Sequence, residues 1–277
     1  MILAEVCARR KQSAIDLAAP SNQNCGMGNL SSEQGRTGMS ADEVRDIVSA
    51  HLERHIGEPV TAYSDVDAWR GEGREPGPPV DVLVTPPEGE RRFAYLSSFG
   101  ACLRPLPAPA YQADGVRKRV EFVMAAIQAG EAEDRIQSLN RAGDLVRKFA
   151  KLVHTQPVTV EPGETVAFGD QPSPLFEGSD LVAFAFMEPR LPSERFGQMR
   201  LTRLDDVSFV ALAPITREEL ELSHREGPSA LSTALRQAGV TEMLDISRKT
   251  VVAPMKPRSG RLARLFSPLA ALFSRRA

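Results

Sequence analysis

The sequence holds one nucleophile with candidate bases, Cys102 with His154 or His224. A thiolate activated by an imidazole can attack an acyl carbon, so this set would suit a cysteine-dependent hydrolase. However, a lone cysteine beside a strand is usually a small buried hydrophobe. The sequence also lacks the G-x-S-x-G nucleophile turn and the G-x-x-x-x-G-K phosphate loop. We therefore predict no catalytic residue and no cofactor, and we keep the hydrolase as an alternative.

Two histidines stand four residues apart in the segment HLERH, at His51 and His55. Zinc proteases need a glutamate at the second or the fourth position of such a segment, and Leu52 and Arg54 stand there. No third ligand cluster occurs elsewhere in the sequence. We predict no metal site and assign both histidines to packing.

Composition and charge are those of a globular protein with an acidic body and a basic end. The chain has 277 residues, 42% of them hydrophobic, and a formal charge of −2. Residues 253–277 contribute +6 and residues 1–39 contribute +1, which leaves −9 over residues 40–252. This balance favours a basic protein partner and no nucleic acid.

The cysteines and the N-terminus favour a cytoplasmic location. The 3 cysteines are widely spaced with no C-x-x-C pair, which is typical of a reducing compartment. The basic cluster Arg9-Arg10-Lys11 follows the first apolar residues, the reverse of a secretory signal. The longest apolar run, near residue 185, is far shorter than the roughly 18–20 residues of a membrane span.

The predicted elements centre on a loop and strand over residues 157–189. Its last part, 181–187, has no polar alternation, so we expect a strand covered on both faces. Helical spacing predicts helices over 139–153 and 228–239, and capping boxes at Ser40 and Thr216 start helices that end near Gly57 and Gly227. Further strands are predicted over 80–84, 92–96 and 119–125, with a hairpin of 199–204 and 207–213.

This order predicts an α+β (mixed α/β) fold with a central mixed sheet and flanking helices. We divide the chain into a disordered extension over 1–39, a domain over 40–252 and a basic amphipathic tail over 253–277. Met39 is a candidate for an internal start, and residues 70–79 have the composition of a turn-rich linker.

The second half resembles the suppressor of fused domain family, through an ordered set of short motifs from about residue 55 to 252. These are Gly163-Glu164-Thr165-Val166 with Gly169-Asp170 and Pro172, Glu188-Pro189 after the apolar strand, Pro214-Ile215-Thr216 with Glu218-Glu219-Leu220, Gly227 with Ala230-Leu231, and Asp245-Ile246-Ser247-Arg248.

This resemblance implies a mixed α/β domain that binds proteins and does not catalyse. Animal members hold a short transcription-factor peptide between two lobes, whereas many bacterial members are single-lobed and look like immunity proteins that neutralise toxins. This chain resembles the single-lobed bacterial kind. The resemblance therefore implies a protein partner, and a toxin is one candidate.

The resemblance also implies a site. A tyrosine, a phenylalanine and an aspartate touch the peptide in animal members, and the matching positions here are Leu152, Val160 and Glu164. Because the aromatic residues are missing, the same peptide is not expected to bind. We take these three residues as the candidate partner-binding site.

The C-terminal tail carries an apolar stripe flanked by arginines, which suggests a third role as a peripheral membrane adaptor. Its candidate contact residues are Arg261, Leu262, Arg264, Leu265, Phe266, Leu269, Leu272 and Phe273. Pro268 interrupts the stripe and would cost a continuous helix about 3 kcal/mol. A helix folded back on the body and a disordered tail are the competing interpretations.

Sedimentation with anionic vesicles tests the membrane role. Each basic side chain gains about 1 kcal/mol near an anionic leaflet, so the full chain should sediment with the vesicles and a chain truncated after Met255 should not. Equal sedimentation of the two chains would exclude the membrane interpretation.

Overall fold

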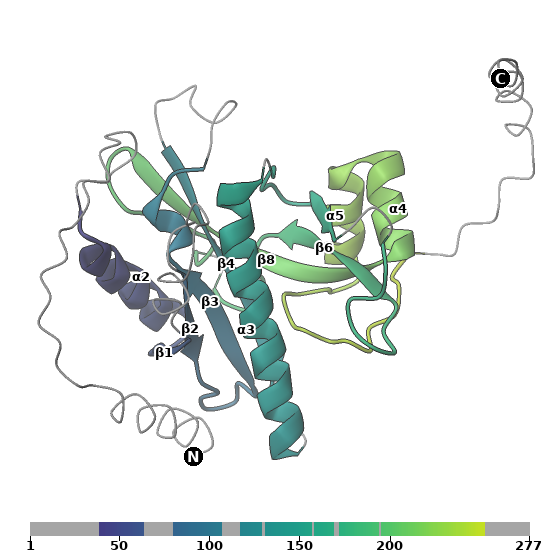
Figure 1. Ribbon diagram of the computed structural model, residues 1–277, viewed down its shortest axis with the longest axis horizontal. Helices are drawn as coiled ribbons and strands as arrows, with labels where there is room; N and C mark the ends of the chain where they lie inside the picture. Colours follow the sequence, from purple (N-terminus) through teal and green to yellow (C-terminus); the bar gives the residue numbers. More distant parts are fainter. Residues whose placement is uncertain are drawn as a thin grey trace, which may run out of the picture.

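The computed structural model describes residues 39–63, 80–106, 117–128, 131–156, 158–168, 172–193 and 195–252. The expected linker over 70–79, the tail over 253–277 and the expected extension apart from Met39 lie outside these residues. The described chain forms a sheet with helices packed on it (Figure 1).

The described strands form one mixed eight-stranded sheet, as predicted. Its path runs β1-β2-β3-β4-β8-β6-β5, and β7 also pairs with β8. The β4–β8 pair is parallel and the other pairs are antiparallel. The strands are β1 (Val60–Tyr63), β2 (Asp81–Thr85), β3 (Phe93–Phe99), β4 (Arg117–Ile127), β5 (Thr165–Ala167), β6 (Leu181–Met187), β7 (Gln198–Arg200) and β8 (Asp205–Thr216).

Strand β8 joins the two halves of the sheet. One of its edges pairs with β4 over residues 205–211, and the other pairs with β7 and then with β6. The apolar segment 181–187 is strand β6, buried at every position. β8 starts at Asp205, so the residues taken as the turn of a hairpin belong to the strand.

Helices cover both faces of this sheet. The helix α3 (Ala132–Thr155) packs on one face through residues such as Val146 and Phe149. The helices α2 (Ala41–His55), α4 (Arg217–Glu226) and α5 (Pro228–Gln237) pack on the other. Of these helices, α3 extends further than its predicted range of 139–153 in both directions. Within the described residues, no helix has the length and apolar character needed to cross a membrane.

The capping boxes at Ser40 and Thr216 are both present, and they start α2 and α4. On α2, the side chain of His51 stacks on Phe196 and Phe209, and its Nε2 lies 2.8 Å from the carbonyl oxygen of Phe196. His55 Nδ1 lies 2.6 Å from Ser193 Oγ. Both histidines thus pack the 188–197 loop against α2, which is the role the sequence suggested.

Residues 240–252, here called the closing segment, return into the sheet after α5. The Ala125 amide donates to the Glu242 carbonyl at 3.0 Å, and the Leu244 amide donates to the Ala125 carbonyl at 2.8 Å. The closing segment therefore pairs with β4 beyond the last residue that pairs with β8. The Glu242 carboxylate accepts hydrogen bonds from the Arg190 and Leu191 amides and from the Tyr95 hydroxyl.

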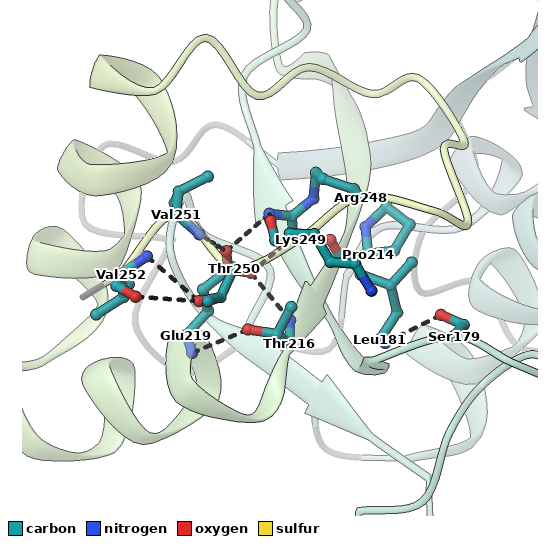
Figure 2. A network of polar contacts seen from close by, with 10 residues as sticks. All are labelled: Ser179, Leu181, Pro214, Thr216, Glu219, Arg248, Lys249, Thr250, Val251 and Val252. Carbon is teal, nitrogen blue, oxygen red and sulfur yellow. Dashed lines mark hydrogen bonds and ion pairs between the residues drawn. The ribbon is translucent and has the colours of Figure 1, made fainter. Parts of the chain in front are cut away.

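The end of the closing segment is fixed by the buried Glu219 of α4 (Figure 2). The Arg248 guanidinium donates to both carboxylate oxygens of Glu219, at 2.7 and 2.6 Å, and to the Pro214 carbonyl at 2.6 Å. The Val251 amide donates to the same carboxylate at 2.9 Å. A bidentate pair of this kind fixes geometry as well as charge.

Replacing Arg248 with methionine should lower the free energy of unfolding by about 3–5 kcal/mol, because it leaves the Glu219 carboxylate buried without its cation. Urea denaturation measures this loss. The control is Lys249→Met, which removes an ion pair to Asp180 whose two side chains are 77% and 61% exposed. That control should change stability by no more than about 0.5 kcal/mol. Equal losses in both variants would contradict the assignment.

Candidate functional site

A depression of about 230 Å³ lies on the α3 side of the sheet, where the parallel strands β4 and β8 begin. Its lining combines apolar residues with the charged and polar residues Lys118, Arg119, Glu161 and Ser208. The full lining is Leu106, Lys118, Arg119, Val120, Val160, Glu161, Pro162, Ser208 and Val210. A cavity of this size with a few polar groups can hold one side chain of a partner.

The path of the chain from β4 through α3 places residues 158–164 at this end of the sheet. The chain reverses after Ile127 and runs back along α3, so that α3 ends at Thr155, near the start of β4. The amide of Gln156 caps the helix by donating to the Leu152 carbonyl at 2.9 Å. Residues 158–164 then pass beside the first residues of β4 and form one wall of the depression.

The three expected site residues fall in this region, but only one lines the depression. Val160 is part of the lining, and it is half-buried against the α3 core. Leu152 is half-buried on α3 and packs against the same core. Glu164 is half-buried at the end of the loop and lies outside the lining.

Hydrogen bonds to neighbouring elements hold the loop in place. The Gly163 amide donates to the Phe186 carbonyl at 2.8 Å, and the Phe186 amide donates to the Glu164 carbonyl at 2.9 Å. The Glu164 amide also donates to the Glu161 carbonyl at 3.1 Å, which closes a turn over Pro162. The position of Glu164 is therefore set by strand β6.

Gly163 allows the loop to approach the start of α5. Its φ is +89°, a backbone conformation that favours glycine, and an added Cβ would lie 2.0 Å from the Pro228 carbonyl oxygen. Any side chain at this position would push the loop and α5 apart. The turn signal Pro162-Gly163 in the sequence thus marks a contact between distant segments.

The chemistry around Cys102 does not support the hydrolase alternative. Cys102 is fully buried, and burial together with the nearby Glu121 carboxylate raises the pKa of its thiol well above its ordinary value. His154 Nε2 lies 2.9 Å from the Ala101 carbonyl oxygen. A protonated, buried thiol is a poor nucleophile, so this is the environment of a structural cysteine.

Local sequence patterns do not indicate most of the lining. Glu161 and Pro162 could have been found from the turn signal beside Val160. Ser208 and Val210 come from β8 and Lys118 and Val120 from β4, and they meet only because these two strands pair in parallel. The sequence carries no local signal for that pairing.

The role of Gly163 is tested by Gly163→Ala, with Gly178→Ala as its control. Gly178 has a similar φ of +71° but nothing within 4 Å of an added Cβ, so its variant should lose only about 1 kcal/mol of stability. Gly163→Ala should lose about 1–3 kcal/mol more, because its methyl group overlaps the Pro228 carbonyl. Thermal or urea unfolding measures both. Equal losses of stability in the two variants would show that the loop and α5 move apart without a measurable loss of free energy, which would contradict the role assigned to Gly163.

Comparison with solved structures finds the same fold at low sequence identity. Drosophila Suppressor of Fused matches with 17% identity and a TM-score of 0.51, over 79% of this chain and 52% of its own. This chain thus spans about half the length of the Drosophila protein. A SUFU homologue from Neisseria gonorrhoeae matches with 21% identity and a TM-score of 0.47, over 76% of this chain and 97% of its own. A Sufu-Fu complex matches with 15% identity and a TM-score of 0.48, over 76% and 90%.

No curated protein matches this chain. The family described as Suppressor of fused protein (SUFU) matches residues 76–249, which run from just before β2 to the Arg248 contact of the closing segment. That match covers more than half of the chain and includes both the depression and the loop beside it. On this evidence the chain belongs to the suppressor of fused family.

Proposed function

We propose that this protein is a non-catalytic protein-binding domain whose partner contacts the depression, the end of α3 and the loop over 158–164. Membership of the suppressor of fused family supports a binding role. The observation that carries the location is the depression itself, which brings apolar and charged side chains together in one lining. Pockets in protein interfaces receive the anchor side chains that dominate binding energy.

The composition of the wall indicates what kind of segment would fit. Leu106, Val160, Pro162 and Val210 offer apolar contact, while Glu161 is exposed on the loop. An aliphatic anchor would bury its surface in the depression, and a neighbouring basic residue could reach Glu161. The half-buried Glu164, three residues further along, adds a second carboxylate to the loop, whereas the lining residues Lys118 and Arg119 are basic.

We propose further that the partner is a basic protein, in the manner of an immunity protein that neutralises a toxin in the cytoplasm. The acidic balance of residues 40–252 supports a basic partner. Part of that balance is internal, however, because the Glu121, Glu219 and Glu242 side chains are fully buried. The carboxylates that can act on a partner are therefore exposed ones, such as Glu161.

Charge reversal at Glu164 tests the location. Glu164→Lys should weaken partner association by about tenfold or more, because it places a cation where a basic partner is expected to dock. The matched control is Glu177→Lys, the same change at an exposed residue that belongs neither to α3 nor to the loop over 158–164. Partners are captured from native cells at low salt, identified by mass spectrometry and measured by titration with the purified protein.

Retention of the partner by the control and its loss by Glu164→Lys would support the proposed surface. Equal affinity in both variants would place the binding surface elsewhere, and capture of no protein at low salt would count against a binding role. Leu152→Asp is a less informative variant, because Leu152 packs against the core and its loss would also damage folding.

A further inference from the structure

Glu121 of β4 is a fully buried carboxylate that holds the turn after β3. Its Oε1 accepts hydrogen bonds from the Gly100 amide at 3.0 Å and the Cys102 amide at 2.9 Å. Its Oε2 accepts from the Ser98 hydroxyl, whose oxygen accepts in turn from the Phe122 amide at 2.8 Å. One carboxyl group thus fixes the start of the short 3-10 helix η2 (Ala101–Leu103).

The charged groups around this turn are engaged with other partners. Arg119 lies on the same face of β4, but its Nε donates to Asp205 at 2.7 Å and its Nη1 to the Cys102 carbonyl at 2.8 Å. From α3, His154 contacts the Ala101 carbonyl. From α2, the Arg45 guanidinium lies over the Phe99 ring and pairs with Asp81 of β2. Arg117 pairs with the other oxygen of Asp205.

Glu121 is therefore buried with hydrogen-bond donors, and no salt bridge between described residues includes it. We propose that Glu121 is a proton-binding clasp, whose protonated form holds η2 closed and whose ionised form lets this turn open. The turn leads directly to Leu106 in the lining of the depression, which is anchored by its amide to the Lys118 carbonyl at 2.9 Å. The clasp thus links proton uptake to the order of one wall of the proposed site.

The hydrogen bonds permit both forms. When Glu121 takes up a proton on Oε2, the new O–H can donate to Ser98 Oγ if the Ser98 hydroxyl turns its own hydrogen away, while Oε1 still accepts from the two amides. When the proton leaves, Ser98 and the two amides all donate to the carboxylate, but a full charge lies on a side chain with no exposed surface. Loss of the proton therefore raises the free energy of the closed form, where the charge is buried, relative to that of the open form, where the charge is solvated.

The direction of the pH effect follows from the two pKa values of this carboxyl. Burial raises the pKa of Glu121 to about 7 in the closed form, against 4.5 for the ordinary carboxyl expected once the turn opens. The closed form is favoured most below pH 4.5, and this advantage is lost as the pH rises through 7. Above that range both forms are ionised and opening no longer depends on this group. The pH effect of His154 has the opposite sign. Burial lowers its pKa, so protonation of this side chain at low pH disfavours the closed form.

The buried thiol of Cys102 reports on this opening, because its amide is held by Glu121. The test uses full-length protein with Cys7→Ser and Cys25→Ser, so that Cys102 is the single thiol, and labels it with 4,4′-dithiodipyridine from pH 5 to pH 8. The same chain with Glu121→Gln is the control, since the amide keeps the shape but does not titrate. The reagent reaches Cys102 only in the open turn, so dividing the two rates removes the intrinsic pH dependence of the exposed thiol.

The ratio of labelling rates, unmodified Glu121 over Glu121→Gln, should rise by about 40-fold between pH 5 and pH 7 and level off near pH 8, as one proton is lost. A ratio that stays constant over this range would overturn the proposal, as would a ratio that falls.

A second measurement keeps the test valid if Glu121→Gln fails to fold. Amide hydrogen exchange of Gly100 and Cys102 in the unmodified chain, corrected for intrinsic exchange, should show the same rise in opening relative to the Val146 amide in the middle of α3. Opening of the turn and of α3 in parallel at every pH would mean global unfolding and would overturn the local clasp.

Discussion

Buried carboxylates with several hydrogen-bond donors each hold this structure together: Glu121, Glu219 and Glu242 accept backbone N–H groups, and Asp205 accepts from Arg117, Arg119 and the Thr202 hydroxyl. Among the described residues, Glu121, Asp205, Glu219 and Glu242 have no exposed surface. Removing an ion of this kind from water costs several kcal/mol even after the protein relaxes, so each one needs donors in fixed positions. Each carboxylate therefore fixes a segment without regular structure. Glu121 holds the turn after β3, Asp205 the β7–β8 turn, Glu219 the closing segment and Glu242 the 188–197 loop.

The sequence predicts the elements whose signals are local. Both capping boxes, the buried strand over 181–187 and the existence of α3 follow from residues within a few positions of one another. The start of α3 was missed because its N-cap, Glu131, makes no capping hydrogen bond and its first turn is exposed. Asp205 was taken for a turn residue because aspartate favours turns, but Arg117 and Arg119 of β4 neutralise it inside the sheet.

The candidate site was less predictable than the fold. The family resemblance points to the loop and to the end of α3, which are close in sequence. Apart from Leu106, the rest of the lining comes from β4 and β8, which are separated by about eighty residues and pair in parallel. Parallel pairing leaves no turn motif between its strands, so neither the pairing nor the depression at its start can be read from local pattern.

The position of the closing segment has a consequence for how the chain folds during synthesis. Residues 242–252 supply the carboxylate that receives the Arg190 and Leu191 amides and the cation that neutralises Glu219. Until these residues emerge from the ribosome, β6, β8 and α4 are already outside but lack both partners. Such non-local contacts form late and slowly. We therefore expect the nascent domain to remain partly assembled, with Ala125 of β4 lacking its closing-segment partner, and to become cooperative only when residues 242–252 arrive.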